Sequence, residues 1–274
     1  MDLKATTYAV DDQIATICLS RPHRGNAWTG RMHTEYRYLL DQADKDRSVR
    51  AIIITGAGDR FCVGGDSKAL DGHSKSGSYD AGTAPDLVTP GDPSFESFRA
   101  DFAYHFALSK PVIAAINGAA AGVGLVLACY ADIRFAVPGA KLTTAHGPLN
   151  LPAEYGLSWL LPRLIGGARA MELLRSSRKF LTDEANQIGL VHTLVPSAEL
   201  MTHTRAYVAD MIARVSPGAL LQSKRQTYLD YHRHVGSSVE EANHLLAEMV
   251  KHPNYKEAIA AFLEKRPANW QDAE

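Results

Sequence analysis

Two glycine-rich stretches of this 274-residue chain could do chemistry through their backbone. The first reads GDRFCVGGDSKAL at 58–70, and the second reads NGAAAGVGLVLACY at 117–130, with no acid or base in it. Each follows an apolar run typical of a buried strand and leads into the start of a helix. Two such turns are what a paired-donor oxyanion hole requires, in which two backbone N–H groups hold the negative charge on a carbonyl oxygen. Either stretch alone fits close packing of a helix against a strand equally well.

The second stretch also resembles the glycine turn of dinucleotide-binding enzymes, where a pyrophosphate approaches a helix N-terminus. That motif should close the first strand of a βαβ unit near the chain start, whereas this one begins at residue 117. The Tyr-x-x-x-Lys pair of short-chain dehydrogenases is missing too, since the nearest match runs from Tyr130 to Arg134. A nicotinamide-dependent oxidoreductase therefore stays open only as a rival to the oxyanion interpretation.

The elements that must position these turns follow from the hydrophobic pattern. Apolar runs predict two strands around an Asp-Asp turn within 7–20, further strands at 49–58, 111–118 and 131–137, and a helix over 29–46 with Thr29 as N-cap. The Gly-, Ser-, Asp- and Pro-rich segment 70–98 predicts a long loop, either a lid or a tolerated surface insertion. Helical periodicity then predicts helices over 157–165, 168–176, 198–214, 217–231, 238–250 and 254–265. We expect an α/β core over 1–200 and a helical region over 201–274.

Composition excludes several classes of function. The net charge of −1 gives no bulk attraction to nucleic acid or an anionic membrane surface. Three scattered cysteines are too few for a disulfide framework or a zinc site. His232 and His234, the densest histidine pair, would point in different directions on a helix, so no metal is expected. With no signal-peptide pattern at the N-terminus and no apolar run of membrane-spanning length, we expect a cytoplasmic protein.

Several segments, in order along the chain, resemble the crotonase superfamily, which includes enoyl-CoA hydratases and isomerases. LSRPHRGNAW at 19–28 is similar to the family's RPxxxNA loop, and RFCVGGDSKAL at 60–70 to its FCAGAD motif. KPVIAAINGAAAGVGLVLACYADIRFA at 110–136 is similar to its KPVIAAVNG…GGG…CDI segment. FLTDEANQIGLVHTLVP at 180–196 and AFLEKRPANW at 261–270 resemble its last two motifs. The resemblance implies a crotonase-like ββα spiral core with a helical C-terminal trimerisation region.

The resemblance also implies which groups bind substrate. The oxyanion donors would be the N–H groups of Gly65 and Val123, holding the thioester carbonyl of an acyl-CoA and stabilising an enolate. Val123 stands where the family usually has a glycine, and this change keeps the N–H.

Coenzyme A would lie along His23, Arg24 and Ala27. Phe262 and Lys265 match positions that contact the CoA moiety, often from a neighbouring subunit. The resemblance implies no cofactor beyond coenzyme A as part of the substrate, and a homotrimer or hexamer.

The two glutamates of a typical hydratase are missing. Their positions fall at Val126 and at or near His146, so ordinary two-glutamate hydration is not expected. Glu154 lies just before an apolar helical run, close to where isomerases of the family carry their acidic group, and is the expected acid/base, with His146 as its partner. We expect isomerisation or atypical hydration of an enoyl-CoA. A carbon–carbon-bond hydrolase using the His146/Glu154 pair, or a non-catalytic acyl-CoA-binding protein, remains as an alternative.

Overall fold

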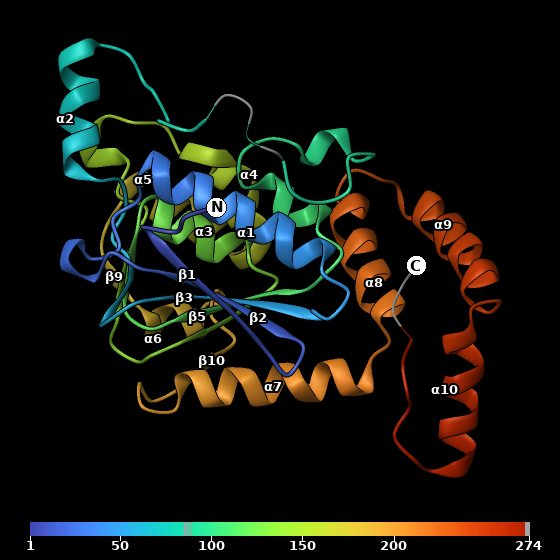
Figure 1. Ribbon diagram of the computed structural model, residues 1–274. Helices are drawn as coiled ribbons and strands as arrows, with labels where there is room; N and C mark the ends of the chain where they lie inside the picture. Colours follow the sequence, from blue (N-terminus) through green and yellow to red (C-terminus); the bar gives the residue numbers. More distant parts are fainter. Residues whose placement is uncertain (85–86, 88, 272–274) are drawn as a thin grey trace.

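The computed structural model describes residues 1–84, 87 and 89–271, and its centre is a six-stranded sheet (Figure 1). The strands lie in the order β1 (Thr6–Asp11), β2 (Ile14–Leu19), β3 (Ala51–Gly56), β5 (Val112–Ile116), β7 (Ile133–Ala136) and β10 (Thr193–Leu194). β1 and β2 form an antiparallel hairpin, and every other neighbouring pair is parallel. All residues of β3 and β5 are buried, as expected of parallel strands that are covered on both faces.

After β3, β5 and β7 of the large sheet, the chain forms a strand of a second, smaller sheet. Its order is β4 (Arg60–Cys62), β6 (Ala119–Ala121), β8 (Lys141–Thr143) and β9 (Phe180–Leu181). β3 continues into β4, β5 into β6 and β7 into β8, so each turn of the chain gives one strand to each sheet. Helices α2 (Ser67–Ser76) and α3 (Val123–Tyr130) follow the first two turns. This repeat is the ββα spiral that the resemblance implies.

Helices cover both faces of the large sheet (Figure 1). On one face α1 (Gly30–Lys45) and the fully buried α3 share a core with Ile52 and Ile54 of β3. On the other face α7 (Leu200–Arg214) packs against Ile53 and its neighbours. Thr29 caps α1 as predicted, because its hydroxyl accepts the N–H of Met32 at 3.1 Å. Helices α4 (Leu157–Ile165), α5 (Gly167–Ser176) and α6 (Thr182–Gln187) complete the core region.

The prediction of a loop over 70–98 is wrong at its start. Helix α2 extends to Ser76, because Asp66 accepts the Lys68 N–H as N-cap and Gly77, at φ +65°, ends the helix. A short 3-10 helix, η2 (Glu96–Phe98), occupies the other end of the segment. Pro85, Asp86 and Val88 lie outside the described residues.

The last three helices are α8 (Pro217–Asp230), α9 (Val235–Met249) and α10 (Pro253–Glu264), close to the predicted ranges. α9 and α10 stand away from the sheets (Figure 1). They leave large apolar side chains exposed, including Val235, Leu246, Phe262 and Leu263. A boundary at residue 200 stays a prediction, and α7 packs on the central sheet. Within the described part of the chain, no helix is long and apolar enough to cross a membrane.

Candidate active site

Three neighbouring parallel strands of the small sheet end at one edge, and each is followed by a predicted site residue. β4 is followed by the turn that holds Gly65, β6 by Gly122 and Val123, and β8 by the segment that leads to His146. The carboxyl ends of adjacent parallel strands meet at the same edge of a sheet. Gly65, Val123 and His146, which are 23 to 81 positions apart along the chain, therefore come to one edge by topology.

Glycines allow the first two turns to touch. A Cβ on Gly124 would lie 2.1 Å from the carbonyl oxygen of Cys62, so α3 can pack on the end of β4 only without a side chain there. A Cβ on Gly64, which has φ +100°, would lie 3.1 Å from the carbonyl oxygen of Ala121. Close packing, one of the two alternatives that the sequence leaves open, is therefore present at both turns and brings them into contact.

The amide groups of Gly65 and Val123 are available to a ligand. The Trp28 N–H donates to the Gly64 carbonyl at 2.7 Å, and the Asp66 N–H donates to the Trp28 carbonyl at 2.9 Å. These two hydrogen bonds do not use the Gly65 N–H, which has no acceptor among the described residues. Val123 is the first residue of α3, so its N–H has no acceptor within the helix and lies at the positive end of the helix dipole.

Gly65, Val123, His146 and Glu154 line one cavity of about 160 Å³. The first turn of α1, α2 with the segment after it, and Tyr155 complete its walls. The structure thus brings together the two predicted donors and both predicted acid/base residues. Val126, at the position of the first missing glutamate, is buried in α3 and does not line this cavity.

Glu154 is half-buried at the start of the short 3-10 helix η5 (Glu154–Gly156), which leads into α4. Burial raises the pKa of its carboxyl, and the nearby His146 opposes this by lowering it. A raised pKa brings a carboxylate closer to the strength of a neutral-pH base. His146 itself has a fully buried Nδ1 atom with no hydrogen-bond partner in the described structure, so the hydrogen-bonding capacity of this atom is unused.

The loop expected to hold coenzyme A is ordered by Asn26, the asparagine of the RPxxxNA-like motif. Its side-chain amide donates to the carbonyls of Ala57 and Arg60 at 2.9 and 2.7 Å, and its oxygen accepts the Arg21 N–H at 2.9 Å. The Arg21 guanidinium pairs with Asp66 at 2.9 Å. The loop is thereby fixed against the turn that carries Gly65.

A basic groove lies beside the cavity. His23 and Arg24 line it together with Arg21 and Lys68, and Ala27 is buried just behind, its carbonyl accepting from Arg21 at 2.7 Å. Thr29, Asp66 and Ala69 line both the groove and the cavity, so the two are continuous.

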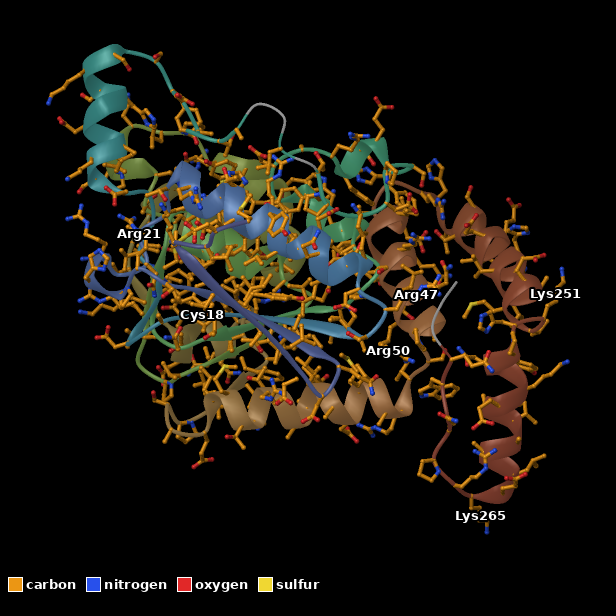
Figure 2. The ribbon with its side chains drawn as sticks, in the orientation of Figure 1. Cys18, Arg21, Arg47, Arg50, Lys251 and Lys265 are labelled. Atoms are coloured by element: carbon orange, nitrogen blue, oxygen red, sulfur yellow. The ribbon has the colours of Figure 1, made fainter. Side chains whose placement is uncertain are left out.

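Phe262 and Lys265 are not brought to this groove within one chain. Figure 2 shows Lys265 at the far end of the molecule from Arg21. Phe262 is 81% exposed on α10, and Lys265 caps the end of that helix. Their expected contact with coenzyme A therefore requires a second subunit.

Two further cavity residues, Tyr79 and His33, are missed by sequence reasoning. Tyr79 lies in the segment after α2, where no pattern marks it. His33 lies on the buried face of α1, where the helical periodicity of the sequence indicates burial and nothing more. Burial lowers the pKa of His33 to about 4, so its imidazole is neutral at neutral pH. No group of three or more His, Cys, Asp or Glu side chains placed to hold a metal occurs in the part of the chain that the structure describes.

Comparison with known proteins agrees with this architecture. The family model for enoyl-CoA hydratase/isomerase matches residues 9–273. The chain is 32% identical to the 1,2-epoxyphenylacetyl-CoA isomerase of Escherichia coli (strain K12), with 94% of each chain covered. It is 28% identical to the short-chain-enoyl-CoA hydratase of Clostridium acetobutylicum, with 97% of each covered.

Among solved structures, it is similar to enoyl-CoA hydratase from Bacillus anthracis, with a TM-score of 0.83, 26% identity and coverage of 97% of this chain and 99% of that one. These relatives do not favour a carbon–carbon-bond hydrolase or a non-catalytic protein, and the dinucleotide interpretation of residues 117–130 is wrong. The protein is an acyl-CoA-processing enzyme of the hydratase/isomerase type. The expectation drawn from the motifs is confirmed, and the chain belongs to the enoyl-CoA hydratase/isomerase family of the crotonase superfamily.

Proposed function

We propose that this enzyme moves the double bond of an enoyl-CoA, with the thioester oxygen held by the Gly65 and Val123 amides and with Glu154 as the single acid/base. The observation that carries the proposal is that both free amides and this half-buried carboxylate line one cavity. Backbone donors suit the task because they are already oriented and need no reorganisation as the oxygen gains charge.

The proposed steps balance without added water. The Glu154 carboxylate takes a proton from a carbon of the acyl group whose conjugate base is stabilised by the thioester. The electron pair moves into the carbonyl, and the resulting enolate oxygen accepts hydrogen bonds from Gly65 and Val123. Protonated Glu154 returns the proton to a different carbon, which shifts the double bond and restores the carboxylate. The raised pKa of Glu154 suits both directions of transfer.

Atypical hydration is the second candidate, and one observation favours it. Hydration needs a group that orients a water molecule as well as a group that moves a proton. His146 lines the same cavity as Glu154, and its unpartnered Nδ1 could accept from or donate to such a water once the water reaches this buried atom. Val126 supplies no such group, so the usual two-carboxylate arrangement does not apply.

Coenzyme A would occupy the groove beside the cavity. Arg21, Arg24 and Lys68 are cations suited to its phosphates, and His23 lies with them on the rim. Buried Ala27 would place backbone groups near the adenine. No cofactor besides the substrate's own coenzyme A enters the proposed mechanism.

A homotrimer or hexamer would complete this groove. The exposed apolar side chains of α9 and α10 need a covering surface, and a neighbouring copy that covers them could bring Phe262 and Lys265 to the coenzyme A. We also propose the cytoplasmic location that the sequence pattern predicts.

The deciding experiment is mass spectrometry of the protein incubated in deuterated water with matched 2-enoyl-CoA and 3-enoyl-CoA esters. Interconversion of the two esters with deuterium incorporation and no added water supports isomerisation. A product heavier by one water supports hydration. Glu154→Gln should abolish either reaction while His23→Gln, on the groove rim, should change mainly KM. Undiminished turnover by the Glu154→Gln protein would overturn the assignment.

A further inference from the structure

The segment that follows α2 crosses the top of the active-site cavity, and it is fixed at both ends. His73 of α2 hydrogen-bonds through Nε2 to the carbonyl of Asp80 at 2.8 Å, and the Asp80 carboxylate accepts the Gly82 N–H at 2.7 Å. The Gly82 carbonyl oxygen would lie 1.9 Å from a Cβ at Gly30, so the segment rests directly on the first turn of α1. Residues 77–82, which we call the strap, therefore hold a defined position over the cavity.

One side chain of the strap reaches across to the opposite wall. The hydroxyl groups of Tyr79 and Tyr155 share a hydrogen bond of 2.5 Å, and both residues line the cavity. Tyr155 is held independently of the strap: its carbonyl accepts the Tyr130 hydroxyl at 2.7 Å, and its ring packs edge-on against Phe102 with centroids 4.9 Å apart. The pair is a hydroxyl bridge between two separately anchored elements.

One of the two tyrosine hydroxyl groups still has an O–H that the bridge does not use. Each phenol has a single O–H, and the bond between the two uses one of them, whichever residue donates. Among the described residues no other acceptor lies within hydrogen-bond distance of either hydroxyl oxygen. Glu154 is adjacent in the chain to Tyr155 but makes no hydrogen bond with it. The remaining O–H is thus free to donate to solvent or to a ligand in the cavity.

The bridge lies at the solvent edge of the cavity, since Tyr79 is 62% exposed whereas Tyr155 is half-buried. Trp28, Leu149 and Leu151 contribute to the same cavity, whereas the Gly65 and Val123 amides are assigned to the thioester oxygen. A plain hydrocarbon chain bound across the bridge would displace water from the free O–H without replacing its hydrogen bond. An acyl group with an oxygen at this place would accept its hydrogen bond instead.

We infer that the Tyr79–Tyr155 bridge selects acyl groups that carry an acceptor oxygen, such as an oxo or ether oxygen, beyond the thioester. The inference rests on the proposed function, since it takes the cavity as the acyl site. Tyr79 and Tyr155 are specificity-determining residues here and take no part in the proton transfer by Glu154.

Binding of unreactive esters tests this without any turnover. Calorimetry would compare hexanoyl-CoA with 4-oxohexanoyl-CoA and 5-oxohexanoyl-CoA, which match it in length and lack a reactive double bond. We expect at least one oxo ester to bind the unaltered protein about tenfold more tightly, a difference of about 1.4 kcal/mol. In Tyr79→Phe and Tyr155→Phe proteins this preference should fall below about threefold, while hexanoyl-CoA binds as before. Tyr207→Phe, on α7 outside the cavity, is the matched control and should keep the preference.

Three results would overturn the inference. Equal binding of the oxo and plain esters by the unaltered protein would show that the free hydroxyl recognises nothing. An equal loss of affinity for all esters in both variants would show that the bridge only holds the strap in place. If no CoA ester bound at all, the acyl site and the proposed function would fall together, whereas an oxo preference without turnover would spare this inference and refute the proposed reaction.

Discussion

Replacing Gly124 with alanine tests whether backbone packing sets the oxyanion donors. The new Cβ would lie 2.1 Å from the Cys62 carbonyl oxygen and 2.8 Å from the Cys62 Cβ. Real Cβ atoms do not come closer than 3.0 Å to other heavy atoms, so α3 and the end of β4 must separate by about 0.9 Å. Val123 begins α3 and Gly65 follows β4, so this separation changes the distance between the two amides.

Two effects on stability oppose each other. Alanine in a helix is favoured over glycine by about 1 kcal/mol. Overpacking costs about 1–3 kcal/mol, and the upper value applies here because the obstacle is a backbone carbonyl and cannot rotate away. We therefore expect Gly124→Ala to lower the free energy of unfolding by about 2 kcal/mol. Urea denaturation would measure it.

The effect on catalysis should be larger than the effect on stability. Displacement of a reacting group by about 1 Å costs about a hundredfold in rate, and loss of one oxyanion donor costs a hundred- to a thousandfold. We expect kcat/KM to fall at least a hundredfold in a protein whose near-ultraviolet circular dichroism remains native. Gly72→Ala, inside α2, is the control, because a Cβ there meets nothing within 4 Å. A folded Gly124→Ala protein within threefold of normal activity would refute the reasoning.

Three further predictions follow from the same contacts. The acid limb of the kcat/KM profile should lie above the ordinary pKa of a glutamate, because burial raises the pKa of Glu154. His146→Gln should move this limb to still higher pH, because His146 lowers the pKa of Glu154. A limb that does not move in this variant would contradict the pairing. The pKa of His105 is lowered to about 3 by burial, so between about pH 6.5 and 3 the unfolded chain binds the proton that the folded chain refuses, and stability should fall as the pH falls. Urea midpoints measured from pH 7 to pH 4 should fall less steeply for His105→Gln, and parallel slopes would argue against this source. Lys265→Ala should raise KM several-fold for a CoA ester but not for the matching pantetheine thioester, which lacks the phosphates; equal effects on both would exclude a phosphate contact.

Long periodic elements of this fold were predictable from the sequence. The helix over 29–46 and its Thr29 cap, the apolar strands at 49–58 and 111–118, and the helices after residue 157 all occur close to their predicted ranges. The helices are long enough for the burial pattern to repeat several times, and the two strands are continuous apolar runs. The three-residue strands β4, β6 and β8 were not predicted, because a run such as Ala119–Ala121 shows no alternation at all.

The site was predictable only in part, for a related reason. Gly65 and Val123 were placed through glycine turns and motif resemblance, and the structure puts them in one cavity with Glu154 and His146. Tyr79 could not have been found, because its partner Tyr155 is 76 residues away and the contact depends on how the strap crosses the cavity. The point where α2 ends and the strap begins was also not predicted, because the glycine and serine residues in 70–76 indicate a loop although these residues form the second half of α2.

The close contact between α3 and β4 has a consequence for redesigning this enzyme. It positions the two proposed oxyanion donors relative to each other through close backbone packing, while Glu154, His146 and Leu151 belong to a separate segment after β8. A combinatorial library limited to those three positions would vary the proposed acid/base residues and leave the two proposed amide donors untouched. Selection from such a library could recover hydratase, isomerase or new activities from one scaffold, because the proposed enolate-stabilising groups are main-chain amides that no substitution at those three positions removes.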